Sequence, residues 1–493
     1  MSILAIDAGT TGVRALVFNA DGQMVSGSYR EFPQHFPRPG WIEHDLDQIW
    51  ESIEVVIAEA IAELDANEIA AVGITNQRET ACAWSRSDGR PRARAIVWQD
   101  RRTAERCDEL RRDGLEPVVR EKTGLVLDPY FTATKFEWIL REGAVVADAD
   151  LALGTIDSWV LYKLTGGRVH ATDWSNASRT MLLDLDTQTW DPSLCDVFNV
   201  PMSALPELRP SSYVYGVTDP ACAAGLSVPV SGIAGDQQAA LFGQACIEPG
   251  MSKNTYGTGS FVLLNTGDTR PPTVEGLLTT IAWGIDGGGP VFAYEGAIFS
   301  TGSAIQWLRD GLEVIADASE AGPLAESVDD TGGVYFVPAF AGLGSPWWDP
   351  YARGALFGLT RGTGRAEVVR AVVESMAYQT RDVVEAMENS AKIEVSEVRV
   401  DGGAAVMDFL CQFQADQLGV KVRRAKVSET TALGAAYLAG LAVGTWSSTD
   451  SIIENWSEGR CFSPAGDRDL ADRRYTKWKA AVERSLAWAE EDT

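Results

Sequence analysis

Asp236 stands at a corner of the chain where one apolar segment gives way to another. Residues 228–234 are mostly apolar, and residues 237–243 carry apolar side chains at helical spacing. We therefore expect a buried strand, a tight turn and a helix that begins at Gln237 or Gln238. Corners of this kind face the ligand crevice in α/β folds, which makes Asp236 a candidate ligand contact. The alternative is that Asp236 only caps the helix, the commonest role of Asp at such a turn.

A turn rich in Gly and Thr, residues 7–12, lies between two short strands expected at 3–7 and 13–19. Backbone N–H groups and hydroxyls at the tip of such a hairpin can bind phosphate oxygens. Arg14 follows the tip and could reach the same anion. The alternative is an ordinary hairpin turn that leads into a third strand at 23–31.

Arg78 and Glu79 follow an apolar strand expected at 69–74. Side by side at a strand end, they could offer donors and an acceptor to a polyhydroxylated ligand. The alternative is a solvated turn, since polar loop residues are common. A helix at about 46–64, opened by a capping box at Asp45, precedes this strand.

The second half of the chain repeats this organisation. Residues 254–260 form another turn rich in Gly and Thr, and residues 401–403 end a strand in Gly-Gly before a helix at about 405–418. A strand that ends in glycines at a helix N-terminus is a natural nucleotide site. Two similar hairpins indicate duplicated α/β domains that face one another, which we place at 1–247 and 248–493. Further elements are expected as a strand at 332–340 and helices at 130–142, 302–312, 366–387, 432–443 and 470–490.

The composition excludes several classes of function. The chain has 493 residues, 45% of them hydrophobic, and a net charge of −27, so it lacks the basic surface that binds nucleic acid or an anionic membrane. No apolar run approaches the ~20 residues of a membrane span. The seven Cys and three His residues (His35, His44 and His170) form no zinc or disulfide pattern, and no signal peptide is visible. We expect a cytoplasmic protein with reduced thiols.

In order and spacing, the three glycine-rich turns resemble the two phosphate motifs and the adenosine motif of the actin-like (ribonuclease H-like) ATPase fold. The chain is more specifically similar to the FGGY carbohydrate kinases. One family signature is matched by Tyr130, Thr132, Lys135, Phe136, Trp138, Ile139 and Glu142, and the other by 354–359, Glu367, Val368, Ala371 and Glu374. Segments 73–80, 95–99, 176–182 and 253–259 resemble the branch of the family that phosphorylates glycerol.

The resemblance implies transfer of a phosphoryl group from ATP, with Mg²⁺, to a polyol such as glycerol. It implies two catalytic residues, Asp236 as general base and Arg14. It implies a polyol pocket of Arg78, Glu79, Trp98, Tyr130, Asp236, Gln237 and Phe261. It implies a nucleotide site of Thr10, Thr11, Gly12, Arg14, Thr258, Gly302, Gln306, Gly403 and Met407, with Asp7 near the metal ion. Relatives are often homodimers or homotetramers, so we expect one of these states.

The chain also departs from the family pattern. Gly12 stands where the family has a Ser, Ala8 replaces a Gln, and Met407 stands where an Asn usually lies on the adenine side. The segment 219–229 lacks the Gly-Arg pair that binds fructose 1,6-bisphosphate in some relatives, so we expect no such regulation. Two alternatives stay open: a sister kinase acting on xylulose, erythritol or gluconate, and a weakly catalytic nucleotide-binding regulatory or assembly protein.

Overall fold

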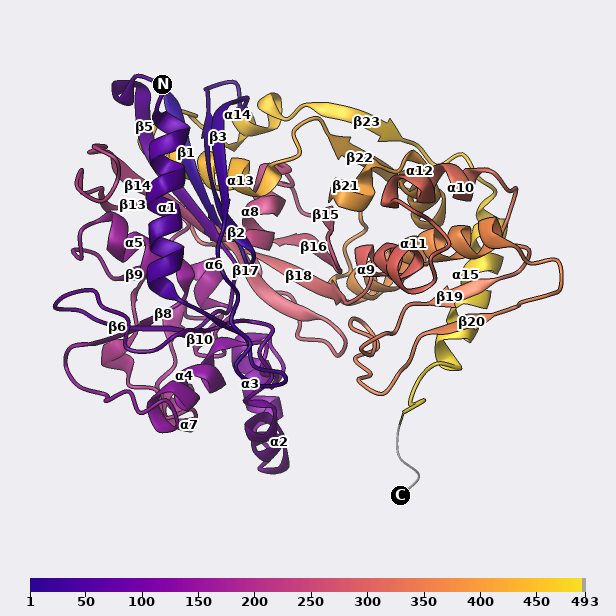
Figure 1. Ribbon diagram of the computed structural model, residues 1–493, viewed down its shortest axis with the longest axis horizontal. Helices are drawn as coiled ribbons and strands as arrows, with labels where there is room; N and C mark the ends of the chain where they lie inside the picture. Colours follow the sequence, from indigo (N-terminus) through magenta and orange to yellow (C-terminus); the bar gives the residue numbers. More distant parts are fainter. Residues whose placement is uncertain (490–493) are drawn as a thin grey trace.

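The computed structural model describes residues 1–489 as two lobes, each built around one central sheet (Figure 1). The first sheet contains, in spatial order, β13 (Ser212–Val217), β14 (Pro229–Gly235), β5 (Ile69–Asn76), β1 (Ser2–Ala8), β2 (Gly12–Phe18) and β3 (Met24–Glu31). β1 pairs in parallel with β5, and β5 with β14, while the β1–β2–β3 meander is antiparallel. The carboxyl ends of β1, β5 and β14 therefore meet at one edge of the sheet.

The second sheet repeats this order with one additional edge strand. It contains β17 (Leu278–Gly284), β18 (Pro290–Ile298), β16 (Ser260–Gly267), β15 (Met251–Tyr256), β21 (Glu397–Gly402), β22 (Lys421–Ala425) and β23 (Glu458–Phe462). β15 takes the place of β1, β16 that of β2, and β21 that of β5, with the same parallel and antiparallel pairings. The predicted duplication of an actin-like α/β domain is confirmed.

Helices cover both faces of the first sheet, and one of them comes from the far end of the chain. α1 (Leu46–Ile61) packs on one face through the cluster that holds Leu4, Ile6 and Val13. The other face packs against α13 (Thr430–Val443), visible in orange among the indigo strands of Figure 1. Sheets covered on both faces have strands that are apolar almost throughout, which is why the strand at 2–8 could be found from sequence.

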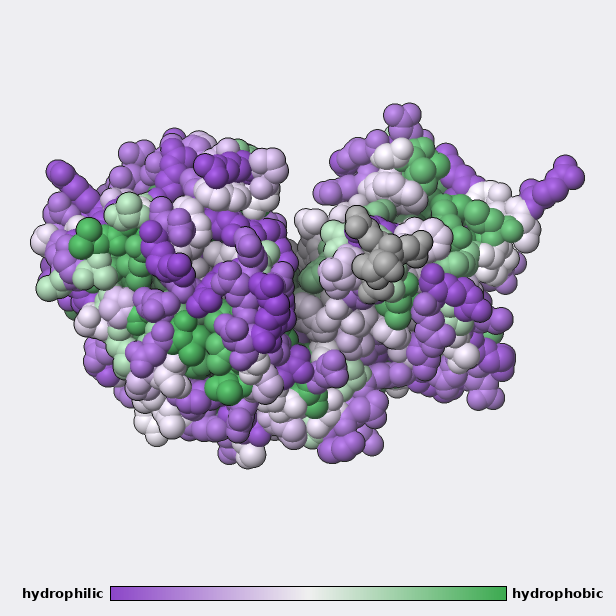
Figure 2. Space-filling model, turned by 90° about the horizontal axis from the view of Figure 1, so that it is seen from below, coloured by the Kyte–Doolittle hydropathy of each residue, from purple (hydrophilic) through white to green (hydrophobic). Residues whose placement is uncertain are grey.

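α13 also crosses α8 (Asp236–Gly243) between the two lobes. A Cβ atom at Gly243 would lie 1.9 Å from the Thr430 carbonyl oxygen, and one at Gly434 would lie 1.8 Å from that of Ala239. The backbones of these two helices approach so closely that only glycine fits at the crossing. Figure 2 shows the surface hollowed between the two lobes.

Several predicted elements are present with different ends. The helix expected at 46–64 is α1, and its N-cap Asp45 accepts from the N–H groups of Asp47 and Gln48. The Gln48 side chain contacts His35, so only half of the predicted capping box forms. The remaining predicted helices are α4 (Thr132–Arg141), α9 (Gly302–Gln306) with a π-helical turn (Trp307–Gly311), α11 (Arg365–Ala391), α12 (Asp408–Leu418) after a 3-10 turn (Gly403–Val406), and α15 (Arg468–Glu483).

Two predictions of local structure are wrong in their extent. The strand expected over 332–340 is only β19 (Tyr335–Val337), because Gly332 and Gly333 have φ values of 61° and 87° and turn the chain. The helix expected from Gln237 or Gln238 begins at Asp236. Among residues 1–489, no helix combines the length and apolar character needed to cross a bilayer.

Candidate active site between the lobes

Asp236 and Arg78 meet where β14 and β5 end side by side. The parallel register places Gly235 opposite Asn76, so the residues that follow each strand leave the sheet at the same edge. Arg78 Nε lies 3.1 Å from Asp236 Oδ1. These two residues are far apart in the chain, and the sheet topology alone brings them together.

Asp236 does not cap α8. The N-cap position is Gly235, and Asp236 is the first helical residue. Its Oδ1 accepts a 2.7 Å hydrogen bond from the Gln237 N–H in addition to the contact with Arg78, and one-third of its side chain is exposed. Burial raises the pKa of Asp236, opposed by the positive charges of Arg78 and Lys253. A partly accessible carboxylate with a raised pKa suits proton transfer.

Arg78 is held by a fully buried network of opposite charges. Its Nη1 lies 2.5 Å from Glu295 Oε2 of β18, in the second lobe. Arg179 bridges the network, with Nη2 at 2.9 Å from Glu295 and Nε at 2.7 Å from Glu79. The side chains of these four residues are at most 2% exposed. Two Arg and two Glu side chains thus compensate one another where the two lobes meet.

Glu295 and Arg179 were missed from the sequence. Despite burial, the charges of Arg179 and Arg78 lower the pKa of Glu295 to about 2, so it is ionised. A signal was available, because Glu295 interrupts the apolar strand 291–298 and a buried carboxylate needs a partner. Arg179 lies in the segment 176–182 that carried the resemblance, but no role was assigned to it.

Aromatic side chains surround Arg78. Tyr130 Oη accepts from Arg78 Nη2 at 3.2 Å, and the ring of Trp98 meets that of Tyr130 edge-on at 5.6 Å. Phe261 of β16 lies on another side, with its centroid 5.8 Å from the Arg78 guanidinium carbon. Trp98 Nε1 donates to Thr10 Oγ1 at 2.9 Å, which links this aromatic wall to the first hairpin. The predicted polyol residues therefore lie together.

Gln237 reaches the second lobe through Lys253, a residue the sequence did not single out. Lys253 of β15 donates to Gln237 Oε1 and, at 3.0 Å, to Thr255 Oγ1. Burial lowers the pKa of Lys253 to about 8, although Asp401 and Asp236 oppose the shift. Lys253 thus adds positive charge close to the Asp236 carboxylate.

The first hairpin carries opposite charges at its tip. Arg14 Nη1 lies 3.0 Å from Glu429 Oε2 and 3.8 Å from Asp7 Oδ2. Burial, with the nearby carboxylates of Asp236 and Glu429, raises the pKa of Asp7 to about 7, while Arg14 opposes the shift. Two side-chain amides donate to carbonyls of the tip, Gln77 to that of Gly9 at 2.9 Å and Gln34 to that of Thr10 at 2.6 Å.

The predicted nucleotide residues of the second lobe form a backbone cradle. The Thr258 carbonyl accepts from the N–H groups of Thr301 and Ser303, both at 3.0 Å, and the Gly257 carbonyl accepts from Gly302 at 3.1 Å. A Cβ atom at Gly302 would lie 2.5 Å from the Gly257 oxygen, so the hairpin and α9 meet only because this residue is glycine.

The remaining nucleotide residues lie at the surface of the second lobe. Gln306 and Gly403 are exposed. The Met407 side chain instead lies beside α10 (Ala321–Glu326), since a Cβ atom added at Gly322 would be 3.4 Å from Met407 Cγ. The predicted position of Met407 beside the nucleotide stays a prediction.

Comparison with models of protein families shows which family the chain belongs to. The model of the N-terminal domain of the FGGY family of carbohydrate kinases matches residues 2–243, and that of the C-terminal domain matches residues 252–443. The chain belongs to the FGGY family of carbohydrate kinases. The domain boundary predicted between 247 and 248 falls in the interval between the two matches.

The relatives of this FGGY chain include proteins named glycerol kinase. It is 54% identical to glycerol kinase 2 of Thermotoga maritima over 492 residues, and 54% identical to glycerol kinase of Carboxydothermus hydrogenoformans over 496 residues, covering 99% of each chain in both comparisons. The structure matches that of Plasmodium falciparum glycerol kinase with ADP at a TM-score of 0.94, 35% identity and 98% coverage of both chains. Gluconate kinase of Lactobacillus acidophilus, 21% identical with a TM-score of 0.89, shares the fold.

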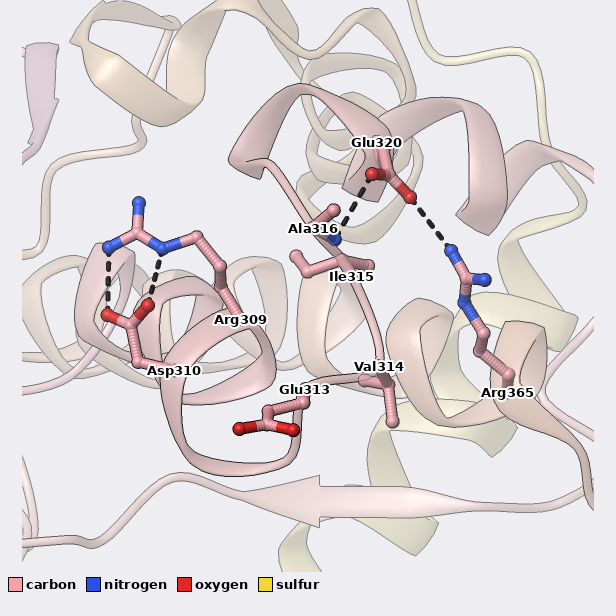
Figure 3. Close-up of a pocket in the computed structure, with 8 residues that line it drawn as sticks. All are labelled: Arg309, Asp310, Glu313, Val314, Ile315, Ala316, Glu320 and Arg365. Atoms are coloured by element: carbon pink, nitrogen blue, oxygen red, sulfur yellow. Dashed lines mark hydrogen bonds and ion pairs between the residues drawn. The ribbon is translucent and has the colours of Figure 1, made fainter.

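One surface pocket of this family member lies in the second lobe. It has a volume of about 600 Å³ and is lined by Arg309, Asp310, Glu313, Val314, Ile315, Ala316, Glu320 and Arg365 (Figure 3). Its charges pair with one another, Arg309 with Asp310 at 2.6 Å and Arg365 with Glu320 at 2.8 Å. None of the predicted site residues lines this pocket, whereas Asp236 and Arg78 meet where β14 and β5 end.

Proposed function

We propose that this chain is a glycerol kinase, which transfers the γ-phosphoryl group of ATP to a terminal hydroxyl of glycerol and forms sn-glycerol 3-phosphate. The observation that carries the proposal is the Asp236 carboxylate, one-third exposed and held 3.1 Å from Arg78. The full-length similarity to proteins named glycerol kinase supports the choice of substrate.

In the proposed reaction Asp236 is the general base. The substrate oxygen attacks the γ-phosphorus as its proton passes to Asp236, and the bond between phosphorus and the ADP oxygen breaks. A positioned base contributes ~10²–10⁴-fold in rate. The raised pKa of Asp236 favours acceptance of a proton, and Arg78 keeps the carboxylate oriented.

Arg78, Glu79 and Tyr130 are the proposed partners of the substrate hydroxyls that do not react. The network with Arg179 and Glu295 fixes Arg78 and Glu79 in place before substrate arrives. A substrate that lacks one of these hydroxyls would leave a buried polar group unpaired, which penalises its binding. Trp98 and Phe261 would limit the length of the carbon chain.

The first hairpin is the proposed site of the transferring phosphoryl group. The tip carbonyls of Gly9 and Thr10 accept from Gln77 and Gln34, and the tip N–H groups, with Arg14 two residues beyond the tip, would bind the anion. Thr258 of the second hairpin, with Gly302, Gln306 and Gly403, would contact the rest of the nucleotide.

The first hairpin also fits a magnesium ion. No cluster of three or more metal-ligating side chains is found in residues 1–489, and Mg²⁺ in kinases usually takes only one or two carboxylates together with phosphates and water. Asp7, whose pKa is raised to about 7 by burial and by two nearby carboxylates, fits as that ligand, since a nearby cation would stabilise its charged form. When bound, the ion would supply positive charge to the phosphate oxygens.

The decisive experiment measures ADP release with glycerol, erythritol, xylulose and gluconate, for the natural chain and for Asp236→Asn. We expect turnover to be highest with glycerol and to fall ~10²–10⁴-fold in the variant. Asp21→Asn, at an exposed turn, is the matched control and should retain activity. Turnover on a five-carbon substrate tenfold above that on glycerol would contradict the choice of substrate.

The assembly and location of the chain are also proposals. We infer a homodimer or homotetramer, as the family resemblance implies, and a cytoplasmic location, as the reduced cysteine pattern indicates. Sedimentation of the purified chain measures the assembly directly, and a monomer at micromolar concentration would contradict this inference.

A further inference from the structure

Tyr29 occupies the space that a side chain at position 12 would need. A Cβ atom at Gly12 would lie 2.7 Å from Cε2 and 2.8 Å from the hydroxyl oxygen of Tyr29, and 2.6 Å from the Arg30 carbonyl oxygen. The Tyr29 hydroxyl is therefore at the base of the first hairpin tip. Gly12 is also the position where the family pattern has a hydroxyl-bearing Ser and this chain has none.

The sheet register aligns Tyr29 with the charged residues of the site. Asp7 on β1 pairs with Arg14 on β2, and Arg14 pairs with Tyr29 on β3, so the three side chains form one row on one face. The Arg14 guanidinium carbon lies 5.3 Å from the centroid of the Tyr29 ring. α13 packs on this face but begins only at Thr430, next to Glu429 and Arg14, so the row lies beyond its end.

The Tyr29 hydroxyl is available to a ligand. The residue is 48% exposed, and the hydroxyl forms no hydrogen bond with any other described residue between 1 and 489. A tyrosine hydroxyl can donate to a phosphate oxygen, and hydrogen bonds to charged groups are stronger than those between neutral groups.

We propose that Tyr29 donates a hydrogen bond to the terminal phosphates of the nucleotide and thereby supplies the hydroxyl that Gly12 lacks. The inference rests on the proposed function, because it assumes that the first hairpin holds those phosphates. The Tyr29 ring has a second effect, since its cation–π contact helps to hold the Arg14 side chain in place.

Two substitutions at this position separate the hydroxyl from the ring. Tyr29→Phe removes only the oxygen, whereas Tyr29→Leu removes the oxygen and the support for Arg14. We would measure by calorimetry the affinity for a non-hydrolysable ATP analogue and for adenosine. The expected result for Tyr29→Phe is an affinity about tenfold weaker for the analogue and unchanged for adenosine, which has no phosphate.

Tyr351→Phe is the matched control, because Tyr351 is also 48% exposed and lies in the other lobe. It should bind both ligands as the natural chain does. If Tyr29→Phe binds the ATP analogue as tightly as the natural chain, the hydroxyl has no role and the proposal is overturned, whatever Tyr29→Leu does. Equal weakening toward the analogue and adenosine would also overturn it.

The same measurement separates this inference from the proposed function. Binding is measured without an acceptor substrate, so it does not depend on which polyol is phosphorylated. A chain that fails to phosphorylate glycerol but loses affinity for the ATP analogue in Tyr29→Phe would refute the substrate and keep the phosphate contact. A natural chain that binds no ATP analogue at all would refute both.

Discussion

The two hairpins that open the two halves of the chain share a frame but differ in charge. In the first, Asp7 of β1 lies opposite Arg14 of β2. In the second, the corresponding pair is Thr255 of β15 and Phe261 of β16, a hydroxyl and an aromatic ring. In each hairpin the first strand also pairs in parallel with another strand of its sheet, β1 with β5 and β15 with β21. Duplication has kept the pairing of the strands and changed the chemistry at the tips.

The second half contains a carboxylate close to its own hairpin, but other side chains already use it. Asp401 at the end of β21 accepts from Gln244 at 2.8 Å and from Thr430 at 2.5 Å. The second tip is then secured by its backbone, through the bonds from Thr258 and Gly257 to the start of α9. Under the proposed function, the two similar glycine-rich turns would serve different parts of one nucleotide, the charged turn at the reacting phosphate and the neutral one beyond it.

The largest expected effect tests whether Glu295, in the second half of the chain, stabilises the buried arginines of the first half. Glu295→Gln would leave buried Arg179 paired with Glu79, and buried Arg78 with Glu79 and the partly exposed Asp236. Breaking a buried ion pair in this way costs about 3–5 kcal/mol. Denaturant unfolding measures the loss, and Glu248→Gln, exposed in the same lobe, is the control. Equal stability of the two variants would show that the bridge between the lobes adds nothing.

The next effect concerns the charged tip itself. Arg14→Gln is expected to lower kcat about 10²–10³-fold with little change in the KM for glycerol, because it removes charge stabilisation in the transition state and not substrate binding. Arg30→Gln, exposed on the neighbouring strand, is the control. A smaller loss of activity in Arg14→Gln than in a Thr258 variant would contradict the proposed place of the reacting phosphate at the first hairpin.

A third prediction uses the pKa of Asp7, raised from 3.8 to about 7. The folded chain keeps this proton while the unfolded chain releases it, so stability is lost as the pH rises from about 4 to about 7. Without ligands, the natural chain should lose about 2–3 kcal/mol relative to Asp7→Asn between pH 5 and pH 7.5. Unfolding at both values measures this, and parallel curves for the two proteins would refute the raised pKa.

The smallest effect is expected at the neutral tip. Thr258→Ala keeps the carbonyl that binds Thr301 and Ser303, so only the hydroxyl is lost. The KM for ATP should rise about tenfold or less with kcat nearly unchanged, as for one hydrogen bond. Thr269→Ala, at an exposed turn of the same lobe, is the control. A fall of kcat by 10²-fold would show that the second hairpin also contacts the reacting phosphate.

The sequence was informative where chemistry is local. Both hairpins, the strand before Asp236 and the helix after it could be predicted from glycine spacing and apolar periodicity. Glu295 and Arg179 could not, because Arg78 lies 217 residues from Glu295 and Glu79 lies 100 residues from Arg179. The fold places Arg179 and Glu295 of β18 beside the end of β5, and a linear pattern does not contain this arrangement.

The packing of Tyr29 over Gly12 was unpredictable for the same reason. Gly12 could be recognised as a departure from the family pattern, but not the residue that fills its space, since the β2–β3 register sets that contact. The strand expected at 332–340 begins only at Tyr335 for a local reason, because the positive φ values of Gly332 and Gly333 turn the chain before it.

The position of α13 on the first sheet has a consequence for synthesis of the chain. Ile3, Ala5 and Leu16 leave the ribosome early, but the face they form is covered by Ala436 and Tyr437, which are made more than 400 residues later. Domains usually fold as units, N-terminal first, during translation. Here the apolar face of the first lobe stays uncovered until α13 has been made, so a chain that stalls before α13 would expose it to chaperones and aggregation.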